Sequence, residues 1–555
     1  MQPLTSAMTT LRRALLAAFK SFIHRHANNG HAVLPLRSLE DFLREAEERL
    51  LGPLDDDGLR RFSEGLKTQF RERLQICGEN MLPSFNHLLP TGLEKGHYLA
   101  LDVGGSTLRV ALVELRGREA SGRESEIVQI QTFKITPDIK ELEGMAFFDW
   151  LAARINEVMN KEPRSTPGPI PMGLAWSFPV EQTSLGGGLL LGMGKGFLAT
   201  KGLLGQDLGE IIKFACKKQG LEVELGAIVN DSTAALLSQA YVHASTHFGL
   251  ILGTGSNIAV HLPVSALSRS KYGNRPPAWF DTASHVIVNT EVSMFGKGVL
   301  PLSRWDELLN ASHPRPEFQP LEHCCSGFYL GEICRLALIE AIESTGVLGG
   351  ELPPSLEKPY SFDTETLSRI EADTSSTLET ATSYFVSKHP SASHQPNISD
   401  ITFIRNLASL ISRRAAALLA AAVFALWELR HEAEAEDLAQ QQQQQQPHVT
   451  ETTRTATVKK GEVIVSVSET NIEEGGESVV SSSPQPPPAT KVAFNGSVIE
   501  HYPQYRDNCQ DYLDGLLAQS SRPACAVDLV PAVESSLLGA AVALASAVEA
   551  AAAEA

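Results

Sequence analysis

Cysteine is scarce in the sequence and shows no spacing typical of a metal site or a disulfide framework. The 555 residues include seven cysteines, an odd number, and no Cys-x-x-Cys pair. This usage predicts reduced thiols in an intracellular, cytoplasmic protein. Cys324 and Cys325 follow His323, but adjacent ligands rarely complete a tetrahedral site, so we expect no metal centre there.

Basic residues are in deficit, and long apolar runs are absent. The 47 Lys and Arg residues and the 65 Asp and Glu residues give a formal net charge of −18, which disfavours direct nucleic-acid binding. No apolar run reaches the roughly 18 residues that a membrane span needs. The length and a hydrophobic content of 43% predict a globular protein with two or more domains.

The first residues lack acidic side chains altogether. No Asp or Glu precedes Glu40, whereas residues 1–39 hold five Arg and Lys residues. Leu11, Leu15 and Phe19 share one face of a predicted helix. A basic amphipathic segment is typical of mitochondrial targeting or of contact with the mitochondrial surface, and a solvated first helix is the alternative.

A Gly-Gly turn between two apolar runs is the most informative feature that the sequence does contain. Residues 97–115 predict a strand, a tight turn and a second strand. The candidate phosphate-binding residues are Asp102, Gly104, Gly105, Ser106 and Arg109. Glycine N–H groups, a hydroxyl and a guanidinium suit the phosphates of ATP, and a carboxylate suits hydrated Mg²⁺. An ordinary hairpin with a buried Asp is the alternative.

A second turn of the same kind lies further along the chain. Residues 247–261 again predict strand, turn and strand, with Gly253, Thr254, Gly255 and Ser256 at the turn. The third glycine of a dinucleotide fingerprint is missing, and a strand follows where that fingerprint requires a helix. The two hairpins therefore predict two similar halves that close on one nucleotide.

Between the hairpins, a strand end and a glycine-rich segment carry further candidate residues. Residues 227–231 predict a buried strand that ends at Asn230 and Asp231, directly before a helix. A carboxylate at such a junction is well held for chemistry, and capping of the helix is the alternative. Residues 186–196 contain six glycines and Lys195, which predicts a loop shaped for a ligand or for movement.

The rest of the chain predicts helices and one low-complexity insertion. We expect two helices over residues 38–75 and a long Ala-rich helix over 401–429. Residues 432–490 contain seven consecutive Gln and a Pro-rich run, which predicts a disordered insertion open to protein partners. The expected organisation is a basic segment at 1–39, an N-terminal half at 40–245 with a small-domain core at 97–232, and a C-terminal half at 246–545 that forms the large domain.

Seven short motifs together resemble those of one family. Their order is LDVGGSTLRV, AWSFPVEQTS, GKGF, IVNDS, LGTGSN, VNTEVSMF and QPLEHCCSGFYLGE. They resemble the eukaryotic hexokinase family over most of residues 40–545, and in detail the divergent hexokinase-like proteins of filamentous fungi. The resemblance implies an α/β, actin-like ATPase fold of the ribonuclease H-like type, with two domains and a cleft between them. It also implies phosphoryl transfer from ATP, with Mg²⁺, to a glucose-like hexose.

The resemblance implies roles for individual residues as well. Asp231 aligns with the catalytic base that takes the proton from the sugar 6-hydroxyl. Lys195 would offset charge near the transferred phosphoryl group. The implied sugar-binding residues are Ser177, Lys195, Asn230, Asp231, Asn289, Glu291 and Glu322. The two glycine turns match the phosphate-binding elements of the family.

Several positions depart from the family pattern. The departures are Thr107 for Asn, Gly186 for Asp, Gly194 for Thr, Val292-Ser293 for an aromatic residue and Gly, Asn495 for Asp, and an altered adenosine segment at 534–541. Each lost contact is expected to cost about 1 to 3 kcal/mol where it leaves a polar group of the sugar unpaired. The sequence therefore predicts a hexokinase whose activity is reduced.

The retained and the altered residues together leave three candidate functions. An active ATP-dependent hexokinase is favoured, because Asp231, Lys195 and Glu322 are retained. A catalytically weak or inactive regulatory protein in carbon-source signalling is the alternative, which the altered segments favour. Another actin-like sugar kinase or ATPase is the third, and the Ser177-Phe178-Pro179 context disfavours it.

Overall fold

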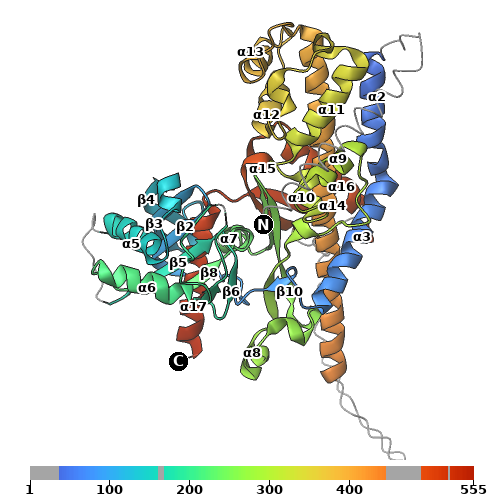
Figure 1. Ribbon diagram of the computed structural model, residues 1–555. Coiled ribbons are helices and arrows are strands. Elements are labelled where there is room, and N and C mark those ends of the chain that lie inside the picture. The colour runs from blue at the N-terminus through green and yellow to red at the C-terminus, as the bar shows by residue number, and fades with distance from the viewer. Residues whose placement is uncertain (1–36, 160–167, 195, 446–488, 523–525, 555) are drawn as a thin grey trace, which may run out of the picture.

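A computed structural model describes residues 37–159, 168–194, 196–445, 489–522 and 526–554 of the protein, and Figure 1 shows its arrangement. Several predicted features lie outside these described residues. They are residues 1–36 of the basic segment, the candidate Lys195 and residues 446–488 of the insertion.

The smaller of the two main sheets has five strands and lies at the left of Figure 1. Its order is β4 (Ser125–Lys134), β3 (Thr107–Arg116), β2 (Lys95–Val103), β5 (Ile170–Trp176) and β8 (Val223–Val229). The first three strands are antiparallel, and β5 and β8 continue parallel to β2. The parallel strands are apolar along most of their length because helices cover both faces.

Four helices cover the smaller sheet. They are α5 (Met145–Met159) and α6 (Leu208–Lys218) on one face, and α7 (Asp231–Val242) and α17 (Ser535–Glu554) on the other. Helix α7 also contacts β9 and β12 of the large sheet. It therefore lies between the two sheets, with its first residue at their boundary.

The large sheet has six strands. Its order is β1 (Leu82–Pro83), β11 (His285–Asn289), β10 (Ser256–Pro263), β9 (Thr246–Leu252), β12 (Thr490–Asn495) and β13 (Val527–Pro531). From β11 to β13 the pairings are antiparallel, antiparallel, parallel and parallel, which repeats the order from β4 to β8 in the smaller sheet. This repeat confirms the two similar halves that the glycine turns predict.

Ten of the described helices share one hydrophobic core with the large sheet, and most lie to the right of it in Figure 1. They are α2 (Leu39–Leu50), α3 (Asp56–Gln75), α9 (Arg304–Ser312), α10 (Pro320–Cys325), α11 (Leu330–Thr345), α12 (Thr364–Ala372), α13 (Glu379–Lys388), α14 (Ile398–Gln445), α15 (Ser497–His501) and α16 (Tyr505–Ala518). The short helices α4 (Pro137–Lys140) and α8 (Pro277–Thr282) lie in connections. Ser38 caps α2 through a bond from the Asp41 N–H, as its sequence position predicts.

The two sequence halves exchange elements between the two packed units. Phe42 of α2 and Phe70 of α3 are buried in the core of the large sheet, alongside α14. The last helix, α17, instead packs on the smaller sheet, where Leu537 and Ala541 are buried. The boundaries 40–245 and 246–545 therefore follow the repeat in the sequence, whereas packing places α2 and α3 with the large sheet and α17 with the smaller one.

Helix α14 extends beyond its predicted end and into the predicted insertion. It continues from Ile398 to Gln445, so residues 432–445 are helical and the predicted start of the insertion is wrong. Glu432 receives a bond from Lys67 of α3 at 3.0 Å, and Ala433 is buried. By length and composition α14 could cross a membrane, but 89% of its apolar window is buried inside the protein. It is a core helix.

A buried ion pair fixes α14 to α9. Arg414 is fully buried and donates from its two terminal nitrogens to Asp306 of α9, at 2.5 and 2.6 Å. Burial alone would raise the pKa of Asp306, but the Arg414 charge lowers it. Because removal of one partner strands the other charge, this pair holds α9 and α14 in one relative position.

Candidate active site

The first glycine turn joins β2 to β3, as predicted. Asp102 lies opposite Arg109 in the antiparallel register, and Arg109 Nε donates to Asp102 Oδ2 at 2.9 Å. One terminal nitrogen of Arg109 donates to the same oxygen, and the other donates to Glu534 Oε2 at 2.6 Å. Within the turn, the Gly104 N–H donates to the Thr107 carbonyl at 3.0 Å. The turn is thus held by an arginine whose charge faces two carboxylates.

The second glycine turn joins β9 to β10 and occupies the same topological position in the large sheet. The Gly253 N–H donates to the Gly255 carbonyl at 2.9 Å, and the Gly253 carbonyl accepts from the Gly327 N–H at 2.8 Å. Thr254 is exposed at this tip, as Ser106 is at the tip of the first turn, next to the half-buried Gly105. Each sheet therefore presents a glycine turn with an exposed hydroxyl residue.

The segments around β12 and α17 connect the two turns. A side-chain carbon on Gly253 would lie 3.6 Å from the backbone nitrogen of Ser497, so the second turn lies beside the start of α15. Asn495 Nδ2 donates to the Ala532 carbonyl at 3.0 Å, and Glu534 follows two residues later. Because Glu534 binds Arg109 of the first turn, two segments joined by this hydrogen bond, at 495–497 and 532–534, link the two turns.

Helix α7 begins at the candidate catalytic base, and the residue before it is the cap. Asn230 Oδ1 accepts from the Thr233 N–H at 2.9 Å, and Asp231 is the first helical residue. Asp231 Oδ1 accepts from the Ser232 N–H at 2.8 Å. The alternative that Asp231 is the helix cap is therefore wrong. Asn230 Nδ2 is buried without a hydrogen-bond partner among the described residues. Since buried donors are normally paired, this amide is well placed to donate a hydrogen bond to a ligand.

Three carboxylates from different parts of the chain converge at the boundary of the two sheets. They belong to Asp231, to Glu291 after β11, and to Glu322 of α10. Burial raises the pKa of Glu291, and the negative charges of Asp231 and Glu322 raise it further. Burial also raises the pKa of Glu322. Such clustering of half-buried like charges is unfavourable in the free protein and is typical of functional sites.

Asparagines position the Glu291 carboxylate. Asn289 Nδ2 donates to Glu291 Oε1 at 2.9 Å, and Asn289 Oδ1 accepts from Asn257 Nδ2 at 2.9 Å. Glu291 itself adopts a left-handed backbone conformation, with φ of +50°, which is strained for a residue other than glycine. Sequence reasoning missed Asn257, although it stands in the LGTGSN motif beside four predicted residues.

Serines position the Glu322 carboxylate against the second glycine turn. Glu322 Oε2 accepts from the Ser256 N–H and from Ser293 Oγ, both at 3.1 Å. A side-chain carbon at Gly255 would lie 2.8 Å from the same oxygen, so a larger residue there would displace the Glu322 carboxylate. Ser293, which the sequence marks only as a departure from the family pattern, therefore supplies a hydroxyl to a candidate sugar-binding residue.

Ser177 and the glycine-rich segment lie at the end of β5. The Ser177 N–H donates to the Val103 carbonyl at 3.2 Å, which puts Ser177 beside the first hairpin. The glycine-rich segment is not wholly a loop, because residues 180–182 and 188–190 pair as strands β6 (Val180–Gln182) and β7 (Gly188–Leu190). Lys195 is outside the described residues, between Gly194 and Gly196, which both have positive φ.

Two of the departures from the family pattern have steric consequences. A side-chain carbon at Gly186 would lie 2.1 Å from the Leu225 carbonyl oxygen of β8, so no larger residue fits. In the altered adenosine segment, a side-chain carbon at Gly539 would lie 2.1 Å from the Ala234 carbonyl oxygen. The glycine that survives there therefore allows α17 to pack closely against α7.

The repeated sheet topology and the residues at its boundary define an actin-like kinase fold. Two family models, both described as hexokinase, match residues 47–241 and 247–546. Hexokinase-1 of Nicotiana tabacum is 32% identical over 60% of this chain and 67% of its own length. Hexokinase-2 of Candida albicans is 30% identical over 67% of this chain and 76% of its own length.

A solved structure has a similar fold. It is a hexokinase from Schistosoma mansoni complexed with glucose, with a TM-score of 0.68 and 24% identity over 92% of this chain and 100% of that chain. This likeness concerns the fold. The two family models, which together match most of the chain, show that it belongs to the hexokinase family.

Proposed function

We propose that the protein phosphorylates the 6-hydroxyl of a glucose-type hexose with ATP. The observation that carries the proposal is the convergence of Asp231 with Glu291 and Glu322, since two sheets of one hexokinase-family chain contribute to a single polar site. A hexose presents hydroxyls that both donate and accept, and buried carboxylates and amides suit such a ligand.

In this proposal Asp231 is the general base. Asp231 lies in the first turn of α7, and the Ser232 N–H holds its carboxylate by a hydrogen bond to Oδ1. The carboxylate would accept the proton of the sugar 6-hydroxyl. The sugar-binding residues are Ser177, Lys195, Asn230, Asn289, Glu291 and Glu322. The unpaired Nδ2 of Asn230 and the fixed carboxylates of Glu291 and Glu322 support these roles.

The two glycine turns would hold the phosphates of ATP. Gly104, Gly105 and Ser106 act from the smaller sheet, and the turn at 253–256 acts from the large sheet. Among the described residues no hydrogen bond engages Asp102 Oδ1, which is therefore available to a water molecule of hydrated Mg²⁺. Mg²⁺ would arrive with the nucleotide. The ion would neutralise phosphate charge during transfer.

A coupled ADP-release assay with glucose, fructose and mannose tests the proposal. The expected result is sugar-dependent ADP release at millimolar sugar, with the sugar 6-phosphate as product. Absence of turnover in folded protein that still binds glucose by calorimetry would refute catalysis. It would favour the regulatory alternative, in which the protein acts in carbon-source signalling without turnover.

We also propose a cytoplasmic protein that contacts the mitochondrial surface through residues 1–39. The basic amphipathic pattern of this segment supports the contact. Cell fractionation of a full-length protein and of one that lacks residues 2–36 tests it. Equal distribution of the two proteins would contradict this proposal without affecting the catalytic one.

A further inference from the structure

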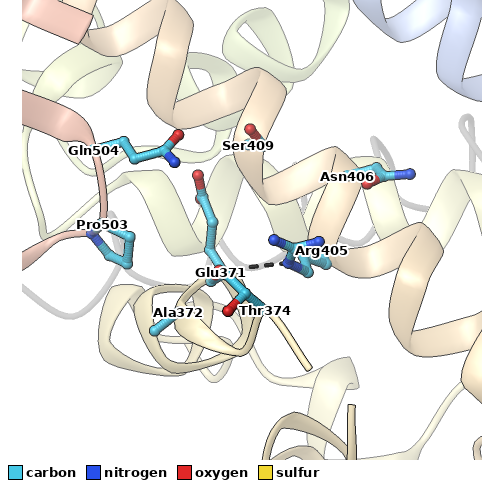
Figure 2. Close-up of a pocket in the computed structure, with 8 residues that line it drawn as sticks. All are labelled: Glu371, Ala372, Thr374, Arg405, Asn406, Ser409, Pro503 and Gln504. Atoms are coloured by element: carbon cyan, nitrogen blue, oxygen red, sulfur yellow. Dashed lines mark hydrogen bonds between the residues drawn. The ribbon is translucent and has the colours of Figure 1, made fainter. Parts of the chain in front are cut away.

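A polar pocket of about 170 Å³ lies in the helical part of the large domain and shares no residue with the candidate active site (Figure 2). The end of α12, the middle of α14 and the Pro503-Gln504 segment line it. Two oppositely charged side chains, Glu371 and Arg405, face this space from α12 and α14. The known chemistry of the family's sugar and nucleotide sites accounts for neither of them.

Glu371 is a buried carboxylate that forms no salt bridge with a described residue. It is 7% exposed, and its carboxylate accepts from the Tyr502 hydroxyl at 2.8 Å and from the Ser412 hydroxyl at 3.2 and 3.3 Å. Burial raises the pKa of Glu371, although these hydroxyls and the positive charge of Arg405 oppose the effect. Arg405 acts on this carboxylate through its charge but bonds only to the Glu371 backbone carbonyl, so no salt bridge from a described residue compensates the carboxylate directly.

Arg405 has the opposite charge and is also incompletely used. Its Nε donates to the backbone carbonyl of Glu371 at 3.4 Å, the bond that Figure 2 marks, and not to the carboxylate. Its two terminal nitrogens make no hydrogen bond or ion pair to any described residue. A guanidinium carries five N–H donors in a planar fork and binds a carboxylate through two of them. The unused nitrogens therefore present a ready site for such a group.

We propose that this pocket binds a small zwitterion of the α-amino acid type, with its carboxylate on Arg405 and its ammonium group toward Glu371. A simple anion would leave the Glu371 charge uncompensated, and a simple cation would leave Arg405 unpaired. Thr374, Asn406 and Gln504 add polar groups at the rim. A cavity of about 150 Å³ accommodates benzene, so a cavity of about 170 Å³ has room for a small amino acid.

Calorimetry with the full-length protein and the standard amino acids tests the proposal. At least one amino acid is expected to bind, and its analogues that lack either the ammonium or the carboxylate group are expected to bind at least about tenfold more weakly. The Arg405→Gln and Glu371→Gln variants are each expected to weaken binding by a similar factor. Arg369→Gln is the matched control, since Arg369 lies on α12, pairs with Glu365 and does not line the pocket.

Four results would overturn the proposal. One is that no amino acid binds at about 10 mM, and another is that binding survives Arg405→Gln in folded protein. A third is that inorganic phosphate or acetate binds as tightly as the zwitterion, which would define a plain anion site. The fourth is that Asp231→Asn weakens binding, which would put the ligand in the active site. If Glu371→Gln does not fold, Arg405→Gln and Arg405→Lys carry the test.

Discussion

Arg109 holds Asp102 of its own hairpin with two nitrogens and Glu534, at the start of α17, with the third. The strand before Glu534 belongs to the large sheet, whereas α17 packs on the smaller one. The Arg109–Glu534 ion pair therefore links the first phosphate-type turn to the segment where the chain passes from the large sheet to the smaller one. In the proposed reaction Glu534 competes with nucleotide phosphate for the same guanidinium.

Replacement of Glu534 by Gln is expected to strengthen nucleotide binding. Removal of one partly exposed carboxylate of an ion pair is worth roughly 1 kcal/mol, so the KM for ATP should fall about fivefold with little change in the KM for glucose. Steady-state kinetics at two ionic strengths measure this effect. Glu114→Gln is the matched control, because Glu114 pairs with Arg116 at the far end of the same hairpin. An unchanged or higher KM for ATP would count against the competition.

The glycine at position 186 is expected to be structurally required. Gly186→Ala puts a carbon 2.1 Å from the Leu225 carbonyl, so the backbone must shift, and we expect a loss of at least about 2 kcal/mol in the free energy of unfolding. Gly192→Ala in the same segment is the control, since no atom lies within 4 Å of its added carbon. Denaturant unfolding measures the free energy of unfolding of both variants. Equal values for the two would show that β8 can shift without loss of stability, which would contradict the requirement for glycine. Gly186→Asp is therefore not expected to restore a family-like sugar site.

The half-buried carboxylate cluster is expected to make the free protein less stable at higher pH. Because burial and the charges of Asp231 and Glu322 raise the folded pKa of Glu291 above its ordinary value of 4.5, its stabilising contribution is full below that value. The contribution is lost as pH rises through the raised folded pKa. Glu291→Gln should therefore raise the melting temperature of the sugar-free protein by about 1 to 3 °C at pH 8 and not at pH 4.

The same variant should bind hexose less well. The Gln side chain can still accept from Asn289, but it replaces a charged acceptor by a neutral one, so the KM for glucose should rise at least about tenfold. Thermal unfolding at both pH values and sugar kinetics on one preparation provide the comparison. A Glu291→Gln variant that is less stable at pH 8, or that keeps its sugar KM, would contradict the role given to the cluster.

Local patterns predicted much of the fold. Ser38 followed by acidic residues marked α2, and glycine turns between apolar runs marked the two central hairpins. These signals act over a few residues, so a single sequence contains them. The low-complexity composition wrongly predicted that the insertion begins at residue 432. The helix continues there because Glu and Gln favour helix and because Glu432 pairs with Lys67 of α3.

Contacts between segments that are distant in the sequence could not be predicted from these local patterns. Nothing local in α17 indicates that it packs on the smaller sheet, and nothing local in Ser293 indicates that it donates to Glu322. The candidate site was predicted through the motif resemblance, and the structure adds the supporting residues Asn257 and Ser293. The Glu371 and Arg405 pocket has no sequence motif, because α12 and α14 meet only through tertiary packing.

The most direct test of the account compares the wild-type protein with Asp231→Asn in sugar-dependent ADP release, with glucose binding measured on the same samples. An amide of equal shape cannot accept the hydroxyl proton, so kcat is expected to fall by about 10² to 10⁴, while calorimetry gives similar glucose affinity and circular dichroism gives an unchanged fold. A variant with kcat within about threefold of wild type would contradict the assignment of Asp231 as the base and the mechanism built on it.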